Sequence, residues 1–279
     1  MDRKTNRSWL AFGTGFPVAL LGGLIGLGGA EFRLPILVAL FGFGAKTAVP
    51  INLAVSLITV IAAFLTRLSV TSNDSLFSIL PDVLTITAAS MTGAWLGAAY
   101  LHRTREHVLE RTIQVLLVLI AILLFYESFF SFTSGRLAQG LPWNVFLGIL
   151  FGSGIGIVSA LLGVAGGELI IPTLILVFGV DIKLAGTASL LISIPTIPVG
   201  MVRYGRQGYY RDRTTLRQVV LPMGAGSIFG ALTGGIMVHY VSGTWLKRIL
   251  GTILFASALK IFGGRNQQTR SAPQGGNSA

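Results

Sequence analysis

Long apolar runs separated by short polar connectors dominate the pattern of this chain. A helix needs about 20 apolar residues to cross a bilayer, and runs of about this length occur at 47–66, 78–101, 109–132, 184–202, 218–240 and 246–263. Two further apolar regions, 9–44 and 143–180, are interrupted by glycine-rich turns. The pattern therefore predicts an all-α, polytopic helical membrane protein.

The apolar pattern occurs twice along the chain. When the sequence is shifted by about 137 residues, positions 11–124 align with 148–261 without a gap. The identical pairs include Gly26 with Gly163, Gly29 with Gly166, Glu31 with Glu168, and Pro35 with Pro172. We therefore predict two homologous transmembrane repeats, 9–132 and 143–263, followed by a disordered cytoplasmic tail over 264–279.

The relative direction of the repeats depends on whether each broken opening region crosses the membrane once or enters and returns. In the first repeat the second connector holds only Arg67, whereas the third holds Arg103, Arg105 and Arg111. The second repeat reverses this bias, because its second connector carries the arginines found between 203 and 217. Basic connectors favour the cytoplasmic side, so the charges favour inverted repeats with re-entrant, broken helices over parallel ones. Both termini are then expected on the cytoplasmic side of the cytoplasmic (inner) membrane.

Composition narrows the class of protein further. Hydrophobic residues make up 52% of the 279 residues and charged residues 11%, with a mean hydropathy of +0.76, so no large water-soluble domain remains. The absence of cysteine excludes disulfides, thiolate metal ligands and cysteine nucleophiles. The net charge of +11 lies in short connectors, where it determines topology beside anionic lipid. We therefore expect membrane lipid, and no nucleic acid, as a partner.

Sequence motifs for catalysis and cofactor binding are missing. Neither Gly-x-Ser-x-Gly nor His-Glu-x-x-His occurs, and the three histidines stand at positions 102, 107 and 239. We therefore expect no enzymatic activity, no metal site and no cofactor. Because a nucleotide-binding motif is also missing, an ion gradient or the substrate's own gradient is the expected energy source.

A glycine-rich break stands at the same place in both repeats, as Gly-Leu-Gly-Gly-Ala-Glu at 26–31 and Gly-Val-Ala-Gly-Gly-Glu at 163–168. Glycine permits a sharp turn and a nearby proline suits the first turn of a helix, so we expect a new helix to begin inside the membrane. Its unpaired N–H groups would suit an anion. The predicted binding residues are Gly28, Gly29, Glu31, Gly166, Gly167 and Glu168. Alternatively, the glycines only allow close helix packing.

Glu31 and Glu168 are the acidic residues that fall within the broken apolar regions. A carboxylate at bilayer depth is expensive, which makes each a candidate for binding a coupling proton. The alternative, compatible with the first, is that each caps its own helix start. Arg33 has no counterpart in the second repeat, where Ile170 stands. It either pairs with Glu31 or helps to hold an anion in one half only.

Small polar residues follow each break at helical spacing: Asn52, Ser56 and Thr59 in the first repeat, and Ser189, Ser193 and Thr196 in the second. Such a stripe either lines a solvated cavity or bonds neighbouring helices. We favour the cavity, with walls formed by Asn52, Ser56, Ser189 and Ser193. The motifs at 93–97 and 230–234, each Gly-xxx-Gly, are assigned to close helix packing rather than to binding.

Two glycine-rich motifs followed by Glu and Pro, each opening one half of a basic protein of this size, resemble the sulfite exporter TauE/SafE family of membrane permeases. The resemblance covers about residues 9–263. It implies a small sulfur-containing anion as substrate, such as sulfite or a sulfonate like sulfoacetate, carried across the cytoplasmic membrane of prokaryotes. The first motif departs from the usual triple glycine, because Ala30 stands where the second has Gly167, so the first helix start is expected to approach a ligand less closely.

The expected function is therefore a secondary transporter, a permease or exporter, for a small sulfur-containing anion, with protons as the candidate coupling ion. Two alternatives remain open, a passive anion channel and a non-transporting membrane scaffold subunit. Flux that is insensitive to a proton gradient would favour the channel. Tolerance of Glu31→Gln and Glu168→Gln would favour the scaffold. A homo-oligomer is compatible with all of them.

Overall fold

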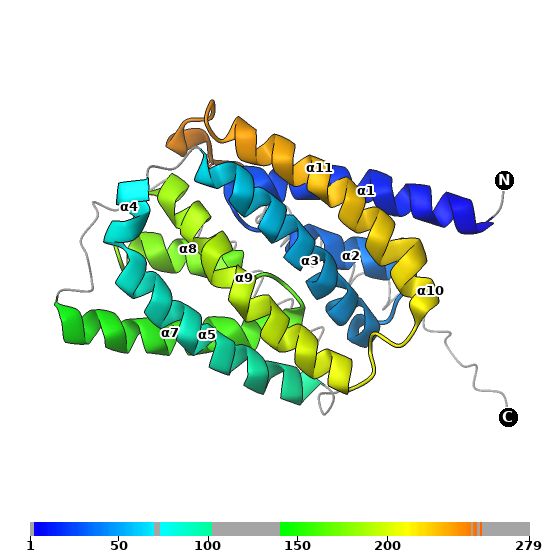
Figure 1. The fold of residues 1–279 in the computed structure, drawn as a ribbon, viewed down its shortest axis with the longest axis horizontal. Helices are drawn as coiled ribbons and strands as arrows, with labels where there is room; N and C mark the ends of the chain where they lie inside the picture. The colour runs from blue at the N-terminus through cyan, green and yellow to red at the C-terminus, as the bar shows by residue number, and fades with distance from the viewer. Residues whose placement is uncertain (1–2, 70–72, 102–139, 247, 250–251, 253–279) are drawn as a thin grey trace, which may run out of the picture.

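The computed structural model describes residues 3–69, 73–101, 140–246, 248–249 and 252. Within these ranges, the helices pack side by side in a bundle (Figure 1). Those that are long and apolar enough to cross a membrane are Asn6–Ile25, Ala45–Leu68, Pro142–Leu162, Ile182–Arg206 and Arg213–Met237. The protein is an all-α membrane protein with several spans, as the apolar pattern predicts.

The first part of the chain forms α1 (Arg3–Ile25), α2 (Ala30–Ala39), α3 (Ala45–Leu68), α4 (Asn73–Ser78) and α5 (Leu80–Leu101). The second part forms α7 (Leu141–Leu162), α8 (Gly167–Leu176), α9 (Ile182–Arg206), α10 (Arg213–Thr215), the π-helical turn η1 (Leu216–Val220) and α11 (Leu221–Met237). The predicted spans in these ranges therefore correspond to α3, α5, α9 and the η1–α11 segment. The predicted span 109–132, most of 246–263 and the predicted tail 264–279 lie outside the described residues.

Each broken opening region consists of a long helix followed by a short one. α1 ends at Ile25 and α2 begins at Ala30, whereas α7 ends at Leu162 and α8 begins at Gly167. Left-handed backbone joins them, with φ of 71° at Gly29 and 81° at Gly166, a conformation that glycine adopts without strain. The predicted helix breaks are confirmed at both places.

The prolines after the breaks differ from the expectation. Pro35 and Pro172 lie inside α2 and α8, at the sixth residue, rather than in the first turn. Proline has no N–H group, so it cannot donate to the carbonyl four residues earlier, which belongs to Glu31 or to Glu168. The glycines alone therefore make the breaks, while the prolines remove the usual helical donor from the main chain of each glutamate.

Glycine-lined faces bring distant helices into close contact. α1 lies along α11, as Figure 1 shows, and α5 lies along α7. A Cβ atom on any glycine of the two Gly-xxx-Gly motifs would collide with the main chain of the neighbouring helix: Gly93 with Ser153, Gly97 with Ile157, Gly230 with Phe16 and Gly234 with Leu20. Both motifs therefore serve helix packing, as predicted.

The long helices run in two opposite directions. Along the contact between α3 and α9, Leu53 lies beside Gly200, and Arg67 near the end of α3 reaches Lys183 at the start of α9. The other helix contacts place α1 and α11 parallel to α3, and α5 and α7 parallel to α9. Helices that correspond in the aligned halves, such as α3 and α9, thus point in opposite directions.

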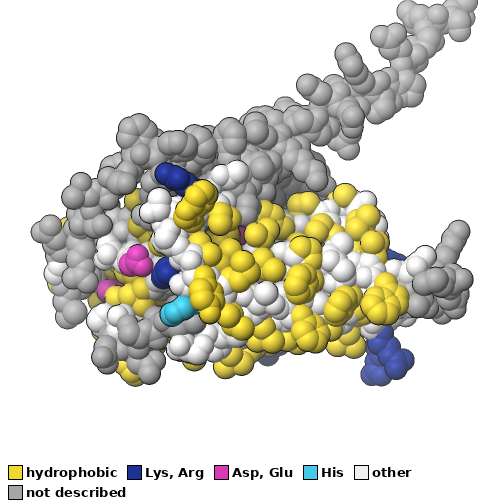
Figure 2. All heavy atoms as spheres, turned by 90° about the horizontal axis from the view of Figure 1, so that it is seen from above, with side chains coloured by type: hydrophobic (Ala, Val, Ile, Leu, Met, Phe, Trp, Pro, Cys, Tyr) yellow, Lys and Arg dark blue, Asp and Glu magenta, His cyan; other side chains and the backbone are white. Residues whose placement is uncertain are grey.

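The surface of the bundle is apolar around its sides. Among the exposed large side chains are Trp9, Leu65, Leu84, Phe146, Phe229 and Trp245. Figure 2 shows hydrophobic side chains across the middle of one face and charged side chains toward its ends. An exposed apolar band between charged ends suits contact with lipid tails and headgroups.

Candidate functional site

The two helix breaks meet in the interior of the bundle. A Cβ atom on Gly167 would touch the main chain of Gly26 and Leu27, and one on Gly28 would touch Ala165. A side chain at Gly167 would therefore push the breaks apart. This contact supports the close-packing alternative for these glycines, while an anion at their N–H groups stays a prediction.

Two buried carboxyl groups lie near each other where the helix breaks meet. The side chains of Glu31 and Glu168 are 3% and 2% exposed, and they lie within interaction range of each other. Both carboxyl oxygens of Glu31, and Oε1 of Glu168, have no hydrogen-bond partner. Two ionised carboxylates in contact repel strongly in a low-dielectric interior, whereas one shared proton replaces the repulsion by a hydrogen bond. The pair is therefore suited to bind and release a proton.

Each glutamate is also the second residue of its short helix. Its negative charge complements the positive end of the helix dipole, and the N-cap residue, Gly29 or Gly166, offers no side-chain cap. The helix-start and proton-binding roles remain compatible for Glu31 and Glu168. Among the described residues, no cluster of three or more acidic or histidine side chains is placed to hold a metal ion.

Arg33 is fully buried next to this pair and bonds to α3. Its Nη1 donates to Oγ of Ser56 at 3.0 Å and to Oδ1 of Asn52 at 3.4 Å. Its Nη2 donates to Oγ1 of Thr59 at 3.0 Å and to the carbonyl of Gly28 at 3.3 Å. These acceptors are uncharged, so they orient the guanidinium without neutralising it, and Nε has no acceptor. A buried positive charge therefore stands beside the carboxyl pair.

Of the two roles considered for Arg33, direct pairing with Glu31 is not what the structure shows. Every hydrogen bond of its guanidinium goes to the main chain or to a neutral side chain. The charge of Glu31 still acts on Arg33 through space. Arg33 is thus left with the second role, holding an anion in one half only, as a prediction.

Asn52 bonds both helix breaks to α3. Its Nδ2 donates to the carbonyl of Ala30 at 2.8 Å and to the carbonyl of Gly163 at 2.9 Å. Ser56 accepts from Arg33 and donates to the carbonyl of Asn52 at 2.7 Å. The polar side chains on this face of α3 therefore form hydrogen bonds with other groups of the protein.

The matching face of α9 does the same from the other half. Ser189 donates to the carbonyl of Gly26 at 2.5 Å, and Ser193 donates to the carbonyl of Ala165 at 2.6 Å. Main-chain carbonyls in a helix break lack their helical donors, and in an apolar interior nearby hydroxyl and amide groups replace them. These bonds support the alternative that the polar stripe bonds neighbouring helices, and a solvated cavity walled by these residues stays a prediction. Asn52, Ser56, Ser189 and Ser193 are all buried and bond neighbouring segments; their contact with a substrate stays a prediction.

Arg67 is a residue that sequence reasoning missed. The apolar pattern predicts a connector charge at this position, but Arg67 is the penultimate residue of α3 and 1% exposed. The sequence does contain a signal for the burial of this residue. Arg67 stands about two turns beyond Thr59, on the same face of the helix. A charge on the buried face of a span is costly and points to a functional role.

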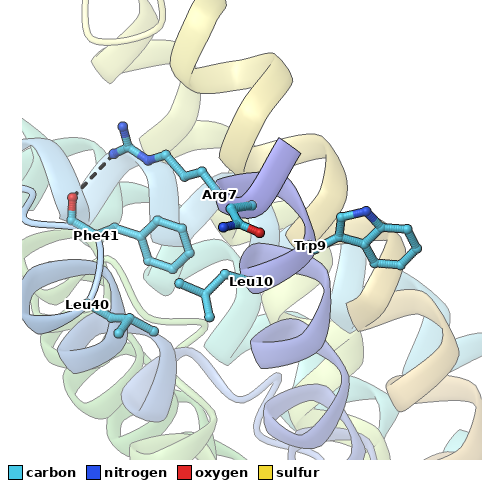
Figure 3. Close-up of a pocket in the computed structure, with 6 residues that line it drawn as sticks. Arg7, Trp9, Leu10, Leu40 and Phe41 are labelled. Carbon is cyan, nitrogen blue, oxygen red and sulfur yellow. Dashed lines mark hydrogen bonds between the residues drawn. The ribbon is translucent and has the colours of Figure 1, made fainter. Parts of the chain in front are cut away.

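A groove of about 750 Å³ opens at the start of α1, apart from the carboxyl pair. Figure 3 shows Arg7 reaching across it to the carbonyl of Phe41, at 3.2 Å, while Trp9 points to the other side of α1. The guanidinium of Arg7 also lies over the rings of Phe41 and Phe43. Leu10 and Leu40 complete an apolar lining. None of the predicted site residues lines this groove, which suits the membrane interface.

Comparison with known proteins agrees with this architecture. Residues 10–261 match the family described as "Sulfite exporter TauE/SafE". Over 120 residues the chain is 28% identical to the probable membrane transporter protein YunE of Bacillus subtilis (strain 168), an alignment that covers 42% of this chain and 41% of that protein. No solved structure matches. Since the family match extends over nearly all of the described spans, the chain belongs to the sulfite exporter TauE/SafE family of membrane transporters.

Proposed function

We propose that this protein is a secondary transporter that moves sulfite or an organosulfonate across the cytoplasmic membrane in a proton-coupled cycle. The observation that carries the proposal is the buried pair of Glu31 and Glu168 at the crossing of the helix breaks. The buried guanidinium of Arg33 beside them, whose hydrogen bonds all go to uncharged groups, supplies an attraction for an anion. One site thus combines a group that titrates with a group that binds negative charge.

The carboxylates and the transported anion compete for the positive charge of Arg33. This competition explains how proton binding is coupled to anion binding. When the carboxyl pair holds no proton, its negative charge opposes an anion and balances Arg33. When the pair is protonated, Arg33 loses that balance and attracts an anion more strongly. Proton binding and anion binding then favour each other, which is the thermodynamic requirement for carrying both together.

Burial favours a carrier over a channel. Glu31, Glu168 and Arg33 are at most 3% exposed, whereas a channel needs a wet path through its binding groups. The opposite directions of α3 and α9 support inverted repeats, in which the halves exchange their shapes to open the site to each side in turn. The arginines after α9 then lie in the cytoplasm with the N-terminus.

The test is uptake of radiolabelled sulfite and of a short sulfonate into proteoliposomes, with and without an imposed pH gradient. Wild type is compared with Glu168→Gln and Glu31→Gln. The matched control is Asp181→Asn, which removes an exposed carboxylate that caps α9 while leaving a residue type that also caps. We expect the gradient to stimulate uptake in wild type and in the control, and either glutamine substitution to remove the stimulation.

Each alternative has its own result in this assay. Sulfite flux that neither the gradient nor Glu168→Gln changes would indicate a passive channel. No flux of any sulfur anion by correctly folded wild type would overturn the substrate and favour the scaffold. Unimpaired coupling in both glutamine variants would show that the carboxyl pair does not carry the coupling proton.

A further inference from the structure

Arg67 occupies a slot between two segments that are distant in sequence. A Cβ atom on Gly26, in the first helix break, would collide with its guanidinium, and so would one on Gly186 in α9. A side chain at either glycine would therefore displace the guanidinium. At 1% exposure, the charge of Arg67 is buried where α3 ends and α9 begins.

The hydrogen-bonding capacity of Arg67 is largely unused. Its Nη2 donates to the carbonyl of Lys183 at 3.4 Å, while Nη1 and Nε have no acceptor. None of the carboxylates in the described ranges is bonded to it. A guanidinium buried without a counter-ion is destabilising, and an oxyanion is the partner whose geometry matches its fork of donors.

Arg67 also continues the polar face of α3 toward the end of the helix. Asn52, Ser56 and Thr59, which hold Arg33, lie on that same face, and all of them are buried. On this face the buried Ala63 stands between Thr59 and Arg67, one helical turn from each. Each of the two guanidinium groups keeps an unpaired Nε.

Uncharged residues stand at the aligned positions of the second half. The position aligned with Arg67 is Tyr204, whose hydroxyl is satisfied by the carbonyl of Ala160 at 2.5 Å. The position aligned with Arg33 is Ile170. Both buried arginines therefore belong to the first half, so any anion site that they form lies on one side of the pseudosymmetric interior.

We infer that Arg67 forms a second anion-binding site, at the end of α3, from which a small oxyanion passes to Arg33. The anion accepts hydrogen bonds from Nη1 and Nε of Arg67. This inference deepens the proposed function and rests on it, but anion binding to Arg67 is measurable without any transport. In the topology proposed above, the end of α3 faces the outer side, so Arg67 serves the outer entrance or exit.

The first test measures thermal unfolding of the purified full-length protein in sulfite and in methanesulfonate, at constant ionic strength set with chloride. Arg67→Gln removes the charge, Arg67→Lys keeps it without the fork, and Arg206→Gln removes an exposed arginine as the control. We expect both anions to raise the unfolding temperature of wild type and of the control. Arg67→Gln is expected to remove this stabilisation, and Arg67→Lys is expected to retain part of it. In the flux assay, Arg67→Gln is expected to raise KM by about tenfold or more, the loss of a charge-assisted bond.

The second test needs no variant, which keeps the inference falsifiable if Arg67→Gln does not fold. Phenylglyoxal modifies guanidinium groups, and peptide mapping of the wild type reports the rate at Arg67 and at Arg206. We expect sulfite to slow the modification of Arg67 but not that of Arg206. The inference is overturned if Arg67 stays unmodified while Arg206 reacts, or if sulfite does not protect it.

Different results would refute the Arg67 site and the proposed function. If wild type carries sulfite with proton coupling and Arg67→Gln leaves KM unchanged, the Arg67 site is wrong and the proposed function stands. If sulfite protects Arg67 and stabilises the protein but is not transported, the site stands and the proposed function is wrong.

Discussion

Single side chains supply the hydrogen bonds that the helix breaks remove. Asn52 bonds the carbonyls of Ala30 and Gly163, and so joins a break from each half to α3. Ser189 bonds the carbonyl of Gly26 in return. Without water in an apolar interior, a lost donor leaves its acceptor unsatisfied. The same residues that look like a binding surface in the sequence therefore hold the crossing together.

Replacing Asn52 tests this structural role. Asn52→Ala removes two hydrogen bonds to main-chain carbonyls, and we expect a loss of about 1–3 kcal/mol in the free energy of unfolding. Thr233→Ala is the matched control, because the exposed hydroxyl of Thr233 donates to the carbonyl of Phe229 within its own helix. The measurement is unfolding of the purified protein in detergent. Equal effects of the two substitutions would contradict the assignment.

At the scale of the elements, the short helices α2 and α8 exist because glycine interrupts each opening region before its charged residue. The long helices that flank them are held by glycine contacts, α1 against α11 and α7 against α5. In lipid, such close approach of main chains replaces the hydrophobic driving force that joins helices in water. The elements could be predicted from the sequence, since spans and breaks depend on local composition, but their partners could not.

A pair of glycine substitutions separates packing from helix propensity. Gly234→Ala places a methyl group against the carbonyl of Leu20, whereas Gly13→Ala, on α1, meets no atom within 4 Å. We expect Gly234→Ala to destabilise the protein by about 1–3 kcal/mol. Gly13→Ala is expected to be neutral or to stabilise it by up to about 1 kcal/mol. Unfolding in detergent compares them, and a similar loss for both variants would refute the role of the α1–α11 contact.

At the scale of the whole molecule, the helices that correspond in the two halves point in opposite directions, and the basic connectors alternate accordingly. The arginines that follow α9 belong to one side and the end of α3 to the other. This arrangement supports two halves that exchange conformations around the carboxyl pair, with the buried arginines in only one of them.

The topology can be tested directly because the chain contains no cysteine. Single cysteines are introduced at the exposed positions Ser69, after α3, and Arg211, after α9. With a membrane-impermeant maleimide added to intact cells, we expect Ser69→Cys to be labelled. Arg211→Cys is expected to react only after the membrane is opened, since the proposed topology places its arginine-rich connector in the cytoplasm. Labelling of both positions from the same side would exclude the proposed topology.

The sequence alone determined the properties that depend on neighbours along the chain. The spans follow from apolar runs, the breaks from glycine, and the positions of Glu31 and Glu168 from the register of the repeat. Only the tertiary structure decided which groups meet. The bonds from Asn52 to Gly163 and from Ser189 to Gly26 join residues 111 and 163 positions apart, and the burial of Arg67 depends on glycines in two other segments. Such contacts form where the two halves of the chain pack against each other. A local sequence pattern does not encode them, because the residues that meet come from different halves.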